Sequence, residues 1–227
     1  MEKEKIVNAL KNLCEGIRIN FKDKYGIISH PLTSHIGVQK NGEILTLDKN
    51  NIEDYVNWKC EKIKEQAKEI DDIFMQVNKP YKLILLYCVK DFLTEEEFNS
   101  MMKDCWVMTE YPNQEGIGIL LKLFEKSKRE LLMTKEELDK FNSLPQVIII
   151  YRGLQGSKAK IRALSWTLSK DKAKWFASRW KSENKVYQAE INKEDIFMYT
   201  NDRNEDEVVI NPTKLKNIKE CVGLQDG

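Results

Sequence analysis

The spacing of hydrophobic positions changes character along this chain. Over the first 145 residues the apolar side chains mostly recur every three or four positions, as between Ile6 and Ile17 and again between Ile52 and Ile63. Such spacing places them on one face of a helix, so this part is predicted to be mainly helical. After Pro145 the apolar positions become β-branched and aromatic, which is typical of strands.

Local signals refine the helical part. Thr94 precedes Glu97 by three residues, and Thr134 stands in the same relation to Glu137. Each pair has the form of a capping box, in which two side chains satisfy the free amides at a helix start. The dipeptide Asn41-Gly42 lies between two short apolar segments and predicts a small hairpin turn.

The part after Pro145 is predicted to contain five strands and one helix. The helix begins after Ser169, a residue suited to the N-cap, and runs to about Lys181. Helices followed by a strand-rich region predict an α+β protein, divided into a helical region 1–145 and a second region 146–227. The five strand segments are 147–151, 163–168, 186–191, 196–199 and 207–210.

Composition bounds what the protein can be. The 227 residues carry a formal charge of +1, so the chain as a whole is not attracted to nucleic acid or to a membrane surface. The charge is unevenly spread, because the stretch from Arg152 to Lys185 holds ten lysines and arginines against two acidic residues. A basic stretch of this kind is suited to a local anionic ligand.

Cysteines, histidines and apolar runs predict a cytoplasmic protein without a metal. The five cysteines are scattered, which favours neither disulfides nor a zinc site. His30 and His35 have no cysteine nearby and are expected in loops or on the surface. The charged start predicts no secretory leader. The longest apolar runs, 83–89 and 147–151, are too short to span a bilayer.

Three short stretches after Pro145 contain candidate chemistry. In the first, Arg152 follows an apolar strand and can offer a planar fork of donors to a phosphate or carboxylate. Gly153 next to it would permit a tight turn and the close approach of a ligand. Taken alone, an arginine in a structural salt bridge is the more common interpretation.

The second and third stretches each contain two side chains of the same kind, two residues apart. Ser165 and Thr167 are two apart, so in a strand their hydroxyls share a face and can orient a carboxylate or a sugar hydroxyl. Glu205 and Glu207 are also two apart and would repel each other, which raises the pKa of one carboxyl. The alternatives are an ordinary strand edge for the hydroxyls and a solvated acidic turn for the glutamates.

The order of the three stretches resembles the R-S-E class of mono-ADP-ribosyltransferases. The likeness covers about residues 147–218, and the helix with Trp175-Phe176-Ala177 is also similar to uncharacterised phage and prophage proteins of this superfamily. Trp166 and Thr167 depart from the family's Ser-Thr-Ser element, and the segment from Tyr199 to Glu205, where the family has its substrate-recognition turn, is short. The matching motifs are Tyr151-Arg152, Ser165-Trp166-Thr167 and Glu205-Asp206-Glu207 with the apolar run to Pro212.

The resemblance implies a β-sandwich with a central NAD cleft and assigns roles to single residues. Glu207 would hold the nicotinamide ribose and stabilise the developing cation, and Ser165 would orient Glu207. Glu205 would activate the acceptor, with arginine favoured. Arg152 would bind the phosphates of NAD. The implied NAD-binding residues are Arg152, Gly153, Ser165 and Thr167, and no metal is implied.

The resemblance also implies a setting and leaves two alternatives open. The acceptor would be a macromolecule, with a protein favoured over a nucleic acid, and the chain would act as a phage or prophage effector in the host cytoplasm. If water replaces the acceptor, the same site makes a NAD glycohydrolase. If the site is degenerate, the fold is a binding module that holds a protein or nucleic acid through its basic stretch.

Overall fold

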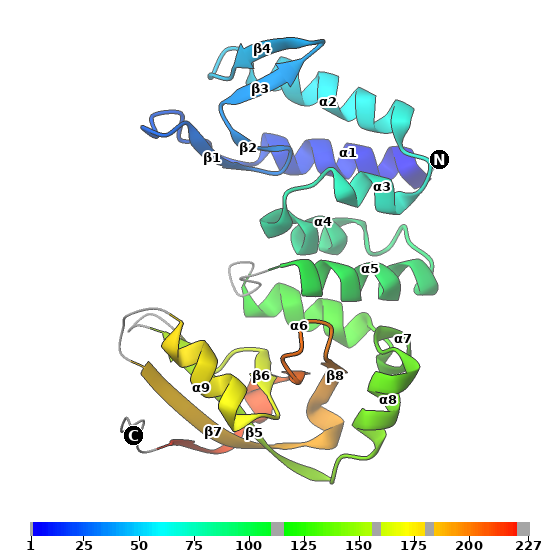
Figure 1. The fold of residues 1–227 in the computed structure, drawn as a ribbon. Helices are drawn as coiled ribbons and strands as arrows, with labels where there is room; N and C mark the ends of the chain where they lie inside the picture. Colours follow the sequence, from blue (N-terminus) through cyan, green and yellow to red (C-terminus); the bar gives the residue numbers. More distant parts are fainter. Residues whose placement is uncertain (1, 110–115, 156–159, 180–183, 222–227) are drawn as a thin grey trace. The chain divides into compact units, whose positions relative to one another are not determined.

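The computed structural model describes residues 2–109, 116–155, 160–179 and 184–221 (Figure 1). The chain divides into two compact units, Met1–Glu115 and Gly116–Gly227. The structure combines helices with a six-stranded antiparallel sheet, so the predicted α+β class is confirmed. Within the described ranges, no helix has the length and apolar character needed to cross a bilayer.

Unit 1 is built mainly from helices. Its first helix, α1, packs against α2, α3 and α4 and buries Ile6, Leu10 and Cys14 (Figure 1). The predicted helices around Ile6 and Ile52 are confirmed. The helices are α1 (Glu2–Glu15), α2 (Ile52–Gln66), α3 (Ile70–Met75), the 3-10 turn η1 (Lys79–Tyr81), α4 (Lys82–Val89) and α5 (Glu95–Met108).

The described residues of unit 1 also form four short strands, β1 (Ile27–His30), β2 (Thr33–His35), β3 (Gly37–Lys40) and β4 (Glu43–Thr46). The hairpin predicted at Asn41-Gly42 is confirmed, and both residues have positive φ, 53° and 88°. The pair β1–β2 was not predicted. The expected loop or surface position is wrong for His30, which is 0% exposed because alternate residues of β1 point inward.

Unit 2 begins with three helices, α6 (Ile117–Lys126), α7 (Arg129–Leu132) and α8 (Lys135–Asn142). The hydrophobic spacing predicts them as part of the helical region that ends at residue 145. In the structure they lie beside β8 (Ile196–Thr200), where the ring of Phe124 stacks on Phe197 with centroids 5.1 Å apart. Arg129 Nη2 also donates a 2.9 Å hydrogen bond to the main-chain oxygen of Glu194. The division between the compact units therefore precedes α6.

The sheet of unit 2 has the order β10-β7-β5-β6-β9-β8 with antiparallel neighbours. All five predicted strand segments are present, and β10 is an addition beyond Pro212. Two 3-10 turns, η3 (Lys193–Asp195) and η4 (Pro212–Lys214), lie between strands. The remaining strands are β5 (Val147–Gln155), β6 (Ser165–Thr167), β7 (Asn184–Asn192), β9 (Glu207–Ile210) and β10 (Lys216–Glu220).

The described strands of unit 2 form one continuous sheet, whereas the sequence predicted two small packed sheets. Its two halves, β10-β7-β5 and β6-β9-β8, meet at the single register pair Tyr151↔Thr167. β6 has only three residues: all three pair with β9 on one edge, and Thr167 also pairs with β5 on the other. Arg152 follows Tyr151 at this junction.

Helix α9 (Lys170–Ser178) covers the end of β5 next to this junction (Figure 1). Its predicted N-cap is confirmed, because the Ser169 hydroxyl accepts a 3.3 Å hydrogen bond from the Lys172 amide. A Cβ at Gly153 would lie 2.1 Å from the carbonyl oxygen of Ala173. The tight turn expected at Gly153 is wrong: the residue lies inside β5, and its missing side chain lets α9 pack closely.

Candidate functional site

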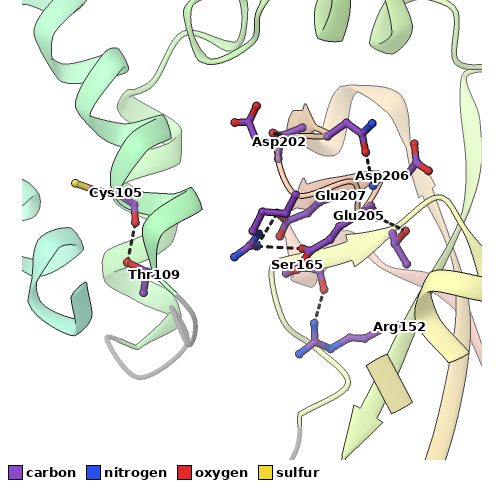
Figure 2. A network of polar contacts seen from close by, with 12 residues as sticks. Cys105, Thr109, Arg152, Ser165, Asp202, Glu205, Asp206 and Glu207 are labelled. Atoms are coloured by element: carbon purple, nitrogen blue, oxygen red, sulfur yellow. Dashed lines mark hydrogen bonds and ion pairs between the residues drawn. The ribbon is translucent and has the colours of Figure 1, made fainter. Parts of the chain in front are cut away.

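The register of β6 and β9 gathers three of the predicted site residues. Thr167 lies directly opposite Glu207, and Ser165 lies opposite Val209. Because residues two apart in a strand share a face and opposed residues do too, Ser165, Thr167 and Glu207 line one face of the strand pair. Figure 2 shows Ser165, Glu205 and Glu207 close together there. Glu207 is 4% exposed, so its carboxylate is shielded from water.

Arg152 extends from β5 to the start of β6. Its Nη1 donates to the main-chain oxygen of Ser165 (Figure 2), and its Nε donates to that of Lys160 at 3.3 Å. Neither bond uses Nη2. Burial lowers the pKa of Arg152 to about 10, while the negative charge of Glu207 acts in the opposite sense. The guanidinium therefore keeps its charge at neutral pH.

The Thr167 hydroxyl is engaged by the main chain. Its Oγ1 donates to the carbonyl of Glu205 at 2.7 Å and accepts from the Ser169 amide at 3.1 Å. These bonds tie β6 to the turn before β9 and to the start of α9. Thr167 is among the residues implied to bind NAD, and in the structure its hydroxyl bonds to two main-chain groups.

The two glutamates stand at the end of a turn that follows β8. Asn204 and Asp206 have positive φ, 54° and 48°, a conformation that asparagine and aspartate tolerate better than most residues. The amide of Asn204 donates to the Asn201 carbonyl at 2.8 Å, and the amide of Asp206 donates to Asn201 Oδ1 at 3.1 Å. The local sequence therefore favours this turn.

Neighbouring elements hold the turn in place. The amide of Leu168 donates to the carbonyl of Asp206 at 3.0 Å, and Tyr199 Oη donates to Asp206 Oδ1 at 2.9 Å. Burial, followed by this bond, raises the pKa of Tyr199, so the phenol remains a donor. Glu137 of α8 accepts a 3.1 Å bond from the Asn201 amide. The carboxylates thus project from an anchored backbone.

Arg203 lies between the two glutamates. Its Nη2 is 3.1 Å from Glu205 Oε2 and 3.5 Å from Glu207 Oε2. The spacing of the glutamates predicts that they repel each other, and the structure adds a cation that both share. Arg203 was missed, although a signal existed: it is the one basic residue in the acidic run from Asp202 to Glu207.

The other predicted features are Gly153, the basic stretch and the absence of a metal. Gly153 packs under α9, so its side of β5 is covered by the helix backbone. Within the basic stretch, Lys174 pairs with Asp171 of its own helix at 3.2 Å. Lys158 and Lys181 lie outside the described residues. The part of the chain that is described contains no group of three or more His, Cys, Asp or Glu side chains able to hold a metal ion.

Comparisons with protein-family models, with curated proteins and with solved structures give no match. A function for this chain has to be argued from the order of its motifs and from the geometry of the site. That geometry offers a buried carboxylate, a second carboxylate two residues away, a hydroxyl on the same face and a charged guanidinium at the neighbouring strand.

Proposed function

We propose that this protein is a mono-ADP-ribosyltransferase that transfers ADP-ribose from NAD to an arginine side chain of a macromolecular acceptor, a protein rather than a nucleic acid. One observation carries the proposal. The pairing of β6 with β9 sets Glu207 on the same face as Ser165, while the Arg152 side chain ends on the main chain of Ser165. The order of these residues is that of the R-S-E motifs.

The NAD phosphates bind at Arg152 in this scheme. Hydrogen bonds through Nε and Nη1 fix the orientation of the guanidinium, and with it the direction of Nη2. A guanidinium held in this way loses little freedom when it binds a pyrophosphate, and it can offer parallel donors. The fold is then of the ADP-ribosyltransferase type, with the NAD cleft where the two halves of the sheet meet.

Glu207 is the catalytic carboxylate. Breaking the bond between nicotinamide and ribose leaves an oxocarbenium-like sugar, which a nearby negative charge stabilises. The charge acts strongly because Glu207 is almost wholly shielded from water. Ser165 lies on the same face of the strand pair, two residues along β6 from Thr167, the register partner of Glu207. Its hydroxyl orients the Glu207 carboxylate.

Glu205 serves the acceptor. It is more exposed than Glu207, with 20% of its side chain accessible against 5%. A carboxylate in that position receives an incoming guanidinium and takes its proton as the new bond forms. The contact of Arg203 with both glutamates supports an arginine acceptor, because a guanidinium already fits between these two carboxylates.

The deciding experiment follows both halves of NAD. The purified chain is incubated with a bacterial lysate and NAD that carries label in its adenylate and, separately, in its nicotinamide. Labelled macromolecules together with released nicotinamide would support a transferase. Released nicotinamide without labelled macromolecules would indicate a glycohydrolase, the alternative in which water is the acceptor. Neither product, beside an active transferase as positive control, would reject NAD chemistry and favour a binding module.

A further inference from the structure

We propose that Arg203 is itself an acceptor, so that the chain transfers ADP-ribose from NAD to its own Arg203. The inference rests on the proposed function and adds a modification site to it. Its basis is the position of the Arg203 guanidinium, which occupies the place between Glu205 and Glu207 that an acceptor arginine needs.

The contacts of Arg203 match those required of an acceptor. The same nitrogen, Nη2, lies 3.1 Å from Glu205 and 3.5 Å from Glu207, so the atom that would attack is next to both the proton acceptor and the carboxylate that faces the sugar. The Arg203 side chain is 37% accessible, whereas that of Glu207 is 5% accessible. The Arg203 side chain is therefore more open to solvent than the buried carboxylate, so that it is accessible to NAD in this scheme.

The backbone holds Arg203 at this place. It sits in the turn whose following residue, Asn204, has a φ of 54° and bonds back to Asn201. The preceding amide, of Asp202, donates to Thr200 Oγ1 at 3.3 Å. A nucleophile held within its own site can reach an effective concentration of about 10⁵ M when it is well oriented, because no second molecule has to be brought in.

Other arginines of unit 2 are engaged elsewhere. Arg129 donates to the main chain of Glu194 at 2.9 Å, and Arg162 donates to that of Pro212 at 2.9 Å. Arg179 stacks on the Trp175 ring, 4.9 Å from its centroid. Arg152 bonds to the main chain of Ser165, and the proposed function assigns it to the NAD phosphates. The modification is therefore expected at Arg203 in preference to these residues.

The transfer step balances without any further reactant. The bond between the ribose C1′ of NAD and the nicotinamide nitrogen breaks, and nicotinamide leaves as a neutral molecule with that electron pair. Arg203 Nη2 forms the new bond to C1′ and gives up one proton to the Glu205 carboxylate, which later releases it to water. The products are ADP-ribosylated Arg203, nicotinamide and one proton.

The site is tested by mass spectrometry of the purified chain after incubation with NAD. Fragment spectra should place ADP-ribose on Arg203. Arg203→Lys keeps the positive charge and removes the guanidinium, and it should lower the incorporated label at least tenfold. Arg18→Lys, at an exposed arginine of unit 1, is the matched control and should incorporate label as the parent does.

A mixing experiment tests transfer within one molecule. Glu207→Gln retains Arg203 and serves as a passive acceptor for active Arg203→Lys protein. For transfer in cis, Glu207→Gln stays unlabelled in the mixture, and the fraction of parent chains labelled per minute is unchanged over a hundredfold dilution. Label on Glu207→Gln, or a labelling rate that falls with dilution, would overturn the assignment to transfer in cis.

The two proposals fail in different ways. Nicotinamide release by the parent with no ADP-ribose on Arg203, or with ADP-ribose only on other residues, overturns the inference about Arg203 and leaves NAD cleavage standing. The parent spectra decide this even if a variant fails to fold. Absence of nicotinamide release from the parent, alone and with lysate, overturns the proposed function and the modification of Arg203 together.

Discussion

The Thr167 hydroxyl donates a 2.7 Å hydrogen bond to the main-chain carbonyl of Glu205. The bond crosses from β6 to the turn before β9, and Thr167 is also the register partner of Glu207. One buried hydroxyl therefore fixes the position of the residue that would receive the acceptor, beside the residue that would stabilise the sugar.

Thr167→Val keeps the shape of the side chain and removes the bond. Because the hydroxyl is buried and bonded to two main-chain groups, its loss should lower the free energy of unfolding of unit 2 by about 1–2 kcal/mol. Denaturant unfolding of the variant measures the change. Thr213→Val, at an exposed threonine, is the control and should differ from the parent by less than about 0.5 kcal/mol.

Gly153→Ala should destabilise unit 2 through α9. The added Cβ would meet the backbone of α9, 2.1 Å from the Ala173 oxygen and 2.7 Å from the Ala177 nitrogen, so helix or strand must move. We expect a loss of about 3 kcal/mol in thermal or denaturant unfolding. At Gly118 in α6 a Cβ meets nothing within 4 Å, so Gly118→Ala should instead stabilise by about 0.5 kcal/mol. Equal effects at both positions would refute the packing role of Gly153.

Separate substitutions distinguish the two glutamates. In the proposed function Glu207→Gln would remove the charge next to the ribose, so it should slow nicotinamide release by roughly a hundred- to a thousandfold. Glu205→Gln should abolish transfer to arginine while NAD hydrolysis largely persists, because the proposal assigns this residue to the acceptor. Both products are measured for each variant, with exposed Glu194→Gln as control. Release at the parent rate in Glu207→Gln would remove Glu207 from the catalytic role.

Arg152→Lys tests the phosphate contact. Lysine keeps the charge but loses the planar fork that the main-chain oxygens of Ser165 and Lys160 hold in place. Affinity for a carbocyclic NAD analogue, whose glycosidic bond cannot break, should fall roughly tenfold, which corresponds to about 1.4 kcal/mol. Calorimetry measures it, and Arg162→Lys is the control. An unchanged dissociation constant would place NAD away from Arg152.

His30 should make the stability of unit 1 dependent on pH. Its Nδ1 accepts a 3.2 Å bond from the Leu32 amide, and Nε2 is buried without a hydrogen-bond partner among the described residues. Burial lowers the pKa of His30 from 6.5 to about 4, because no group compensates the charged form. The folded state thus binds a proton less readily than the unfolded state. The stability contributed by neutral His30 is fully present above pH 6.5 and is lost as the pH falls toward 4.

The expected slope is about 1.4 kcal/mol per pH unit between these two values. Hydrogen exchange of amides in α1 and α2, measured from pH 7.5 downward and corrected for intrinsic exchange, follows it. His30→Asn keeps an acceptor for the Leu32 amide and should remove the slope. Exposed His35→Asn should retain it. A parent without the slope would show that His30 is not buried as a neutral ring.

Some features were determined by the sequence alone because they depend on residues close together in the chain. The capping box of Thr94 and Glu97 forms as predicted, with the Glu97 amide bonded to the Thr94 hydroxyl at 3.2 Å. The turn at Asn41-Gly42 and the N-cap at Ser169 likewise need only a few neighbours. The β-branched run of β9 identified a buried strand from composition. In each case the hydrogen bond or the preference for burial depends only on residues within the segment itself.

Tertiary structure decided the features that depend on partners distant in sequence. His30 is buried because β1 pairs with β2 and turns alternate residues inward, and Gly153 is needed because α9 packs on β5. The sheet is continuous because three-residue β6 still reaches Tyr151 with one residue. Arg203 lies beside Glu205 and Glu207 because the turn between β8 and β9 brings its Nη2 to 3.1 Å and 3.5 Å from their carboxylates. The spacing of the sequence predicted the two carboxylates. Strand register and turn conformation determined which cation lies between them, because both arise from contacts between segments.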